Sequence, residues 1–249
     1  MARKYEGRKA LVTGAASGIG KHLVEVLIGH GARVVCCDLN AAAGQAVVDE
    51  LNARYGSANG NAPVAWFVKL NVTSVVGGDG GGVQEGGRTC EREVGLGLRS
   101  KVFDVNTVGA MYTIQGAINH FRSYKSGGSI IVTASLSGLY AFKADPAYSA
   151  SKHAVIGLVR SASLSTYKEG IFINAIAPAS TESGMMTKEV MDFSRAVGMV
   201  TSKESIMEAF EHFLKPGSRA SGQVVGALHD KIQVFGQPSP PGLKAKSRM

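Results

Sequence analysis

Cysteine is scarce in this 249-residue chain, and its spacing excludes several kinds of site. The three cysteines, Cys36, Cys37 and Cys90, are odd in number and have no metal-ligand spacing, so we expect neither a disulfide framework nor a metal site. Cys36 and Cys37 stand in an apolar run, which favours reduced core residues over reactive thiols. We therefore expect a reducing, intracellular compartment.

Long hydrophobic runs are also lacking. No apolar stretch approaches the roughly 20 residues that span a bilayer, and the first six residues are polar, so we expect neither membrane association nor a signal peptide. Hydrophobic residues make up 45% of the chain and charged residues 18%, a balance that indicates a folded protein. The length suits a single domain over residues 1–249.

Acidic residues are outnumbered, 19 against 27 lysines and arginines, which gives a net charge of +8. The basic residues are spread along the chain without an aromatic-interleaved patch, so nucleic acid is not expected as a partner, and a surface that suits an anionic ligand is the better interpretation. The last three residues, Ser247-Arg248-Met249, resemble a peroxisomal address. We expect a cytoplasmic protein, with peroxisomal targeting as the alternative.

Strand and helix patterns alternate along the first 70 residues. Short apolar runs at 9–13, 32–38 and 63–70 predict strands, and helical spacing at 19–30 and 41–55 predicts the helices between them. This order predicts an α/β fold with a doubly wound parallel sheet and helices on both faces.

The alternation stops at residues 77–87, which contain seven glycines. A helix there would lose about 7 kcal/mol relative to alanine, so an irregular glycine-rich loop is expected over 77–98. Patterns return with helices at 102–124 and 148–168 and strands at 128–134 and 171–176. A loop, one helix, a sheet-ending segment at 222–235 and a loose tail at 236–249 complete the prediction.

A glycine-rich turn, Gly14 to Gly20, joins the first strand to the first helix. Such a turn lets the backbone approach a pyrophosphate at the helix N-terminus, which is typical of a Rossmann-type dinucleotide site. Asp38 ends the second strand, 24 residues after Gly14, where a carboxylate binds the adenosine ribose hydroxyls and repels a 2′-phosphate. No basic residue stands at Ser17 or Leu39, so NAD is expected rather than NADP.

Four polar residues form a second pattern. Tyr148 and Lys152 are four residues apart on one helical face, Ser135 ends the preceding strand, and Asn106 lies in the helix before it. A neighbouring ammonium stabilises a phenolate, so we expect a lowered pKa for Tyr148 and a role as general base toward an alcohol. Ser135 would hold the substrate oxygen, and Asn106 would anchor a proton-relaying water.

These motifs resemble the short-chain dehydrogenase/reductase family, over residues 7–76 and 99–186. Within it, the chain is most similar to 15-hydroxyprostaglandin dehydrogenase and other NAD-dependent alcohol dehydrogenases. The similar segments are Val12-Thr13-Gly14-Ala15-Ala16, Gly18-Ile19-Gly20, Cys37-Asp38-Leu39-Asn40, Ala43-Gly44, Tyr148-Ser149-Ala150-Ser151-Lys152-His153 and Asn174-Ala175-Ile176-Ala177-Pro178.

The resemblance implies a role for each matching residue. Ser135, Tyr148, Lys152 and Asn106 would be catalytic, with Lys152 also on the nicotinamide ribose. The cofactor would be bound by Gly14, Ser17, Gly18, Ile19, Gly20, Asp38, Asn71, Val72, Tyr148, Lys152, Pro178, Thr181 and Ser183. The chain departs from the family pattern in three places: the Asn-Asn-Ala-Gly strand end is absent, Asn71 replaces an aspartate, and Ala179 replaces a glycine.

The substrate and the assembly are less narrowly defined. Apolar residues near the expected mouth of the site suggest a hydrophobic or lipid-like secondary alcohol, or else simply pack a lid: Leu139, Tyr140, Phe142, Met185, Met186 and Met191. The resemblance implies a homodimer or homotetramer, and a helical stripe including Ala154, Leu158 and Ala162 fits either that interface or the core. Two other functions stay open: an NADPH-linked ketoreductase, and a non-catalytic protein that retains the fold.

Overall fold

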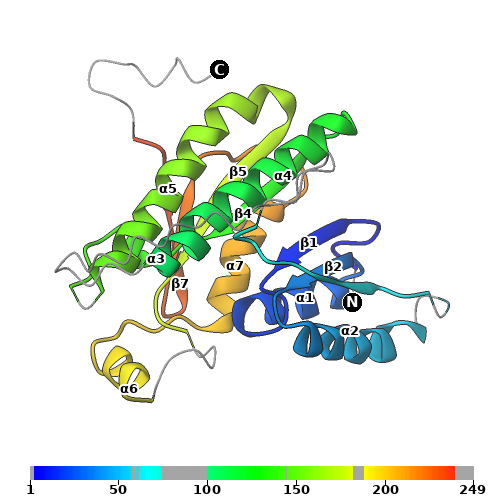
Figure 1. Ribbon diagram of the computed structural model, residues 1–249, viewed down its shortest axis with the longest axis horizontal. Helices are drawn as coiled ribbons and strands as arrows, with labels where there is room; N and C mark the ends of the chain where they lie inside the picture. Colours follow the sequence, from blue (N-terminus) through cyan, green and yellow to red (C-terminus); the bar gives the residue numbers. More distant parts are fainter. Residues whose placement is uncertain are drawn as a thin grey trace. The chain divides into compact units, whose positions relative to one another are not determined.

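The computed structural model describes residues 3–57, 60, 62–74, 100–143, 145–181 and 188–238. The chain, whose helices and strands are labelled in Figure 1, divides into two compact units. The first unit comprises Met1–Asn71 with Ser180–Gly198, and the second comprises Val72–Ala179 with Met199–Met249.

The first unit is a three-stranded parallel sheet in the order β1-β2-β3. Helices α1 and α2 contact each other and the sheet. Its elements are β1 (Lys9–Thr13), α1 (Gly18–Gly29), β2 (Arg33–Asp38), α2 (Ala41–Tyr55), β3 (Ala65–Lys69) and α6 (Lys188–Ala196). The ranges expected from the sequence for the first five agree with these to within two residues at each end.

Local sequence signals explain where α2 begins and how closely it packs. Asn40 caps the helix, its side chain accepting a hydrogen bond from the amide of Ala43 at 3.1 Å. Gly44 is buried against Phe67 of β3, and a Cβ at this position would lie 2.0 Å from that ring. Glycine is therefore required here by close packing.

The second unit is a four-stranded sheet in the order β4-β5-β6-β7, in which only β7 runs antiparallel. Its elements are α3 (Ser100–Phe103), η2 (Asp104–Val108), α4 (Gly109–Ser123), β4 (Gly128–Thr133), η3 (Leu136–Gly138), α5 (Pro146–Thr166), η4 (Tyr167–Glu169), β5 (Ile171–Pro178), α7 (Lys203–Leu214), β6 (Val224–Leu228) and β7 (Lys231–Phe235).

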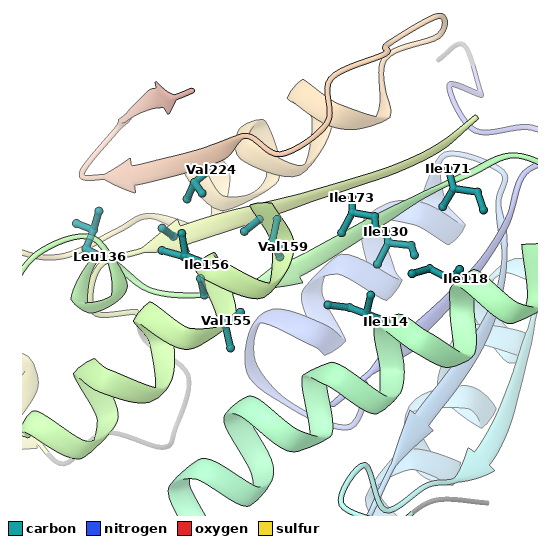
Figure 2. Close-up of a cluster of buried hydrophobic side chains, with 13 residues drawn as sticks. Ile114, Ile118, Ile130, Leu136, Val155, Ile156, Val159, Ile171, Ile173 and Val224 are labelled. Carbon is teal, nitrogen blue, oxygen red and sulfur yellow. The ribbon is translucent and has the colours of Figure 1, made fainter. Parts of the chain in front are cut away.

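The core of the second unit lies between its sheet and two long helices. Ile114 and Ile118 of α4 point toward Ile130 of β4, and Val155 and Val159 of α5 complete this buried cluster (Figure 2). Helix α7 packs on the same strands from the other side (Figure 2). The second unit therefore has helices on both faces of its sheet.

Several elements differ from the sequence prediction. Helix α5 begins at Pro146 rather than at residue 148, because Asp145 caps it through the amide of Tyr148 at 2.9 Å. The helix expected over 102–124 contains the π-helical turn η2. Two helices, α6 and α7, replace the single one expected after β5, and the segment 222–235 folds into the antiparallel pair β6-β7.

The α/β Rossmann-type fold class is confirmed by the parallel pairing and by the solved structures described below. The strands of the described segments form two sheets rather than the one expected, and no described strand pairs with the second edge of β1 or of β4. The organisation of residues 1–249 as a single domain stays a prediction.

The glycine-rich segment 77–98 and the tail from residue 239 onward lie outside the described residues. None of the described helices has the length and apolarity to cross a bilayer.

Asn52 of α2 provides a test of the first unit. Its side chain accepts hydrogen bonds from the amides of Val64 and Ala65 and donates one to the Ala65 carbonyl, all within 3.0 Å. We expect Asn52→Ala to lower the free energy of unfolding by about 2–3 kcal/mol, because three backbone groups lose their partner. Gln45→Ala on the same helix, which removes an exposed bond to Asp49, should change it by less than about 0.5 kcal/mol. Equal effects of both variants in urea unfolding would contradict this role.

Candidate active site

The glycine-rich turn lies in the first unit between β1 and α1. Gly14 and Gly18 have φ values of +68° and +53°, a region that favours glycine. A Cβ on Gly20 would lie 2.1 Å from the Gly14 carbonyl oxygen, so the turn closes on itself without room for a side chain. Ser17, the N-cap of α1, makes no side-chain capping bond, and the first turn has no acidic residue. This helix N-terminus suits a phosphate.

Asp38 joins the end of β2 to this turn. One carboxylate oxygen accepts a hydrogen bond from the Ala16 amide at 3.0 Å, and the other accepts from the Asn40 amide at 2.9 Å. The two bonds fix the carboxylate at the carboxyl end of the sheet, where ribose hydroxyls bind in folds of this type. The residues of the first unit therefore fit the adenosine half of a dinucleotide.

The other predicted cofactor residues are divided between the units. Asn71 is exposed and Thr181 is buried in the first unit, whereas Val72 and Pro178 belong to the second. Ser183, Met185 and Met186 lie outside the described residues.

Ser135 lies in the second unit where β4 gives way to η3. Because β4 and β5 are parallel and in register, their carboxyl ends meet, and the Ser135 hydroxyl donates to the Pro178 carbonyl at 3.5 Å. Its oxygen also accepts from the Ser137 amide at 3.2 Å, which caps η3. Ser135 is buried.

Tyr148 and Lys152 occupy the first turns of α5. The Lys152 ammonium lies 5.6 Å from the centre of the Tyr148 ring and donates to the Thr133 carbonyl at 3.1 Å. Burial lowers the pKa of Lys152 to about 8, because the charged form is penalised away from water. Close to this pH the lysine exchanges its proton readily.

The ionisation of Tyr148 differs from the sequence prediction. Burial raises the pKa of Tyr148, hydrogen bonding with Ser135 lowers it, and the Asp145 carboxylate raises it, with burial the largest cause. The sequence predicts that the nearby ammonium lowers this pKa, and that prediction is wrong: burial is the largest cause and raises it, so Tyr148 keeps its proton at neutral pH.

Asn106 joins this group through Ser151. Its side-chain amide donates to the Ser151 hydroxyl at 3.1 Å, and that hydroxyl donates to the Tyr148 carbonyl at 2.7 Å. Thr107 adds a bond to the Ser151 carbonyl at 3.3 Å. The second unit thus brings Ser135, Tyr148, Lys152 and Asn106 onto or against the first turns of α5.

Sequence reasoning missed two residues that shape this group, Asp145 and Ser151. An aspartate directly before a proline is a helix-start signal, and it could have placed the N-terminus of α5 correctly. Ser151 carries no such signal.

The remaining candidates are buried or exposed as follows. Cys36 and Cys37 are buried free thiols, as predicted, and burial raises the pKa of Cys36 to about 11. Tyr140 and Phe142 are exposed, whereas Met191 is buried. The helical stripe of α5 includes Val155 and Val159, which belong to the core of the second unit, with Leu158 and Ala162 packed against it. The described segments contain no cluster of potential metal ligands.

Comparison with known proteins places this geometry in a family. The family model described as short chain dehydrogenase matches residues 8–76 and 86–193, which is well over half of the chain. The chain belongs to the short-chain dehydrogenase family. The resemblance to this family found in the sequence is thereby confirmed.

Two relatives and one solved structure illustrate the range of the family. The chain is 31% identical to (+)-cis,cis-nepetalactol synthase NEPS3 of Nepeta racemosa, over 84% of this chain and 85% of the relative. It is 34% identical to a 3-beta-hydroxysteroid dehydrogenase of Comamonas testosteroni, over 75% and 76%. A crystal structure of a short-chain type dehydrogenase/reductase from Mycobacterium marinum, 20% identical, has a TM-score of 0.71 over 92% of this chain and 96% of its own.

Lys152 gives a prediction about stability and pH. Its folded pKa of about 8 lies below the ordinary value of 10.5, so the folded state binds fewer protons than the unfolded state between these pH values, and stability rises with pH there. Lys152→Met lacks this dependence. We expect its free energy of unfolding, relative to that of the parent, to fall by about 2–3 kcal/mol from pH 7 to pH 10. A difference that is constant over this range, measured by urea unfolding, would contradict the burial of the charge.

Proposed function

We propose that this member of the short-chain dehydrogenase family is an NAD-dependent oxidoreductase that transfers hydride between a secondary alcohol and nicotinamide. The observation that carries the proposal is the grouping of Ser135, Tyr148 and Lys152 around the N-terminal turns of α5. A hydroxyl, a phenol and an ammonium grouped in this way supply the groups that proton transfer to or from an alcohol oxygen requires.

The cofactor assignment depends on the first unit. Gly14, Gly18 and Gly20 provide the tight turn, and the N-terminus of α1 provides amides for the pyrophosphate. Asp38 would bind the adenosine ribose. Bound nicotinamide would accept or give the hydride. The resemblance implies that Lys152 and Pro178 also contact the cofactor.

Each residue of the second unit has a distinct part in the proposed proton transfer. Tyr148 carries the proton that is given to a ketone oxygen or taken from an alcohol. Ser135 holds that oxygen and hydrogen-bonds to Tyr148, which favours the ionised phenol. Lys152, with its pKa of about 8, exchanges a proton with solvent near neutral pH. Asn106, fixed by Ser151, orients a water for this exchange.

NAD rather than NADP is proposed because Asp38 presents a fixed carboxylate and its neighbour Leu39 is an exposed apolar residue, 62% accessible. A 2′-phosphate would meet a negative charge there with no cation at position 39.

A hydrophobic alcohol is proposed as substrate because Tyr140 and Phe142 are exposed just after η3. The steroid substrate class in the printed name of one relative supports the same choice. We also propose a homodimer or homotetramer, as the resemblance implies.

Binding of reduced dinucleotides tests the cofactor assignment. We expect saturable binding of NADH, followed by nicotinamide fluorescence, with NADPH weaker by at least about tenfold. Asp38→Ala should weaken NADH about 10- to 100-fold, because hydrogen bonds to a charged group contribute about 1.5–3 kcal/mol. Asp49→Ala, an exposed aspartate of α2, is the matched control and should leave both affinities unchanged.

Two outcomes would contradict this assignment. A preference for NADPH would favour the ketoreductase alternative. Absence of binding by either dinucleotide would favour a non-catalytic protein that retains the fold.

Substitution of the tyrosine tests the chemistry. Tyr148→Phe removes the proton carrier, so we expect turnover of secondary alcohols to fall by about 10²- to 10⁴-fold while the NADH affinity stays within about twofold of the parent value. Tyr124→Phe, which changes an exposed tyrosine at the end of α4, should have no effect on either quantity. Undiminished turnover in Tyr148→Phe would exclude the mechanism.

A further inference from the structure

The turn η3 and helix α5 carry different members of the proposed active site. Ser135 is the N-cap of η3, and Tyr148 and Lys152 belong to α5. A separation of about 1 Å from the productive geometry costs on the order of 10²-fold in rate. The contacts that fix η3 against α5 therefore determine whether the Ser135 hydroxyl reaches Tyr148.

A buried serine makes the polar contact between these two elements. The hydroxyl of Ser149, the residue after Tyr148, donates to the Ser137 carbonyl of η3 at 2.7 Å. The amide of the same Ser137 donates to the Ser135 hydroxyl at 3.2 Å. Ser137 thus links Ser149 to Ser135 through two hydrogen bonds, and Ser149 is only 8% exposed, so water does not replace its hydroxyl readily.

A glycine makes the second contact. A Cβ on Gly138 would lie 2.6 Å from the carbonyl oxygen of Lys152 and 2.7 Å from its carbonyl carbon. The backbones of η3 and α5 are therefore in direct contact one residue beyond the Ser137 bond. The polar and the steric contact act in the same direction and hold the turn on the helix.

We propose that Ser149 is a positioning residue, which holds the η3 turn on α5 and thereby keeps the Ser135 hydroxyl within reach of Tyr148. Its hydroxyl proton is already given to the Ser137 carbonyl, so it takes no part in the chemistry itself. This inference rests on the proposed function for its effect on turnover, but its effect on Tyr148 does not depend on any substrate.

The ionisation of Tyr148 provides the readout that a merely structural role would not move. Apart from Ser135, the groups that act on Tyr148 in the described part of the chain are Asp145 and Lys152, both on or beside its own helix. In the described hydrogen bonds, neither of these side chains is bonded to the Ser149 hydroxyl or to Ser137, and Ser149 meets Asp145 only through its backbone amide, which donates to the Asp145 carbonyl at 3.0 Å. Loss of the Ser149 hydroxyl bond leaves the Asp145 and Lys152 side-chain bonds in place and acts on Tyr148 through Ser135, whose hydrogen bonding lowers the pKa of Tyr148.

The experiment compares Ser149→Ala with the parent by NMR of ¹³Cζ-labelled tyrosine, in which the Tyr148 signal is assigned by its loss in Tyr148→Phe. We expect a smaller ionised fraction of Tyr148 in Ser149→Ala at the same alkaline pH. We also expect a roughly 10- to 100-fold lower kcat with KM within about twofold. Gly138→Ala, which forces the turn away from the helix, should also lower kcat.

Ser163→Ala is the matched control. Ser163 lies on the same helix and is buried, but its hydroxyl donates to Arg160 of its own helix at 2.7 Å. It should leave the Tyr148 titration and turnover at parent values. Thermal unfolding shows whether each variant folds, and Ser149→Cys, which keeps nearly the volume and only a weak donor, replaces an unfolded Ser149→Ala.

The possible results separate the two proposals. An unchanged Tyr148 titration in folded Ser149→Ala, or an equal change in Ser163→Ala, would overturn the positioning role. A parent protein without turnover but with the expected shift in Ser149→Ala would support the positioning role and contradict the proposed reaction.

Discussion

The candidate active site depends on the direct contact between the η3 turn and helix α5. At Gly138 the two backbones meet without room for a Cβ, and β4 and η3 are joined only by Ala134 and Ser135. The end of β4 therefore places Ser135 next to α5, the helix that carries Tyr148. Because β4 and β5 pair in parallel, Pro178 arrives at the same edge. Sheet register and one backbone contact together determine where the polar groups of the second unit meet.

Burial then sets the chemistry that these groups perform. It raises the pKa of Tyr148 and lowers that of Lys152 to about 8, so in both cases burial shifts the equilibrium toward the neutral form. A phenol that keeps its proton is ready to act as an acid toward a ketone at neutral pH. Action as a base toward an alcohol requires phenolate, which forms more readily at alkaline pH and with the Ser135 hydrogen bond in place. The same residues thus serve both directions of the proposed reaction, with pH favouring one or the other.

Much of the fold and of the candidate site was predictable from the sequence, because the sequence patterns that indicate them are local. The apolar runs of β1 and β2 and the helical spacing of α2 gave ranges close to those observed, and the motif around Tyr148 was found by its spacing. The misses concern contacts between distant segments. Nothing near Gly138 in the sequence indicates that the Lys152 carbonyl lies against it. The π-helical turn carries Asn106, whose hydrogen-bond partner Ser151 is 45 residues away. The raised pKa of Tyr148 was missed for the same reason, since burial is set by packing that spacing does not reveal.

The edge of β4 away from β5 explains why the Lys152 ammonium donates to the Thr133 carbonyl. The Ala134 amide donates across the pair to the Ile176 carbonyl of β5. Successive residues of a strand direct their backbone groups to opposite sides, so the Thr133 carbonyl faces away from β5. No described strand pairs with that side of β4, and the Lys152 ammonium takes the carbonyl instead. The lysine thus satisfies a backbone acceptor that a neighbouring strand would otherwise pair, at the cost of burying a charge. That cost is what lowers its pKa, and it links the architecture of the sheet edge to the proton exchange proposed for the site.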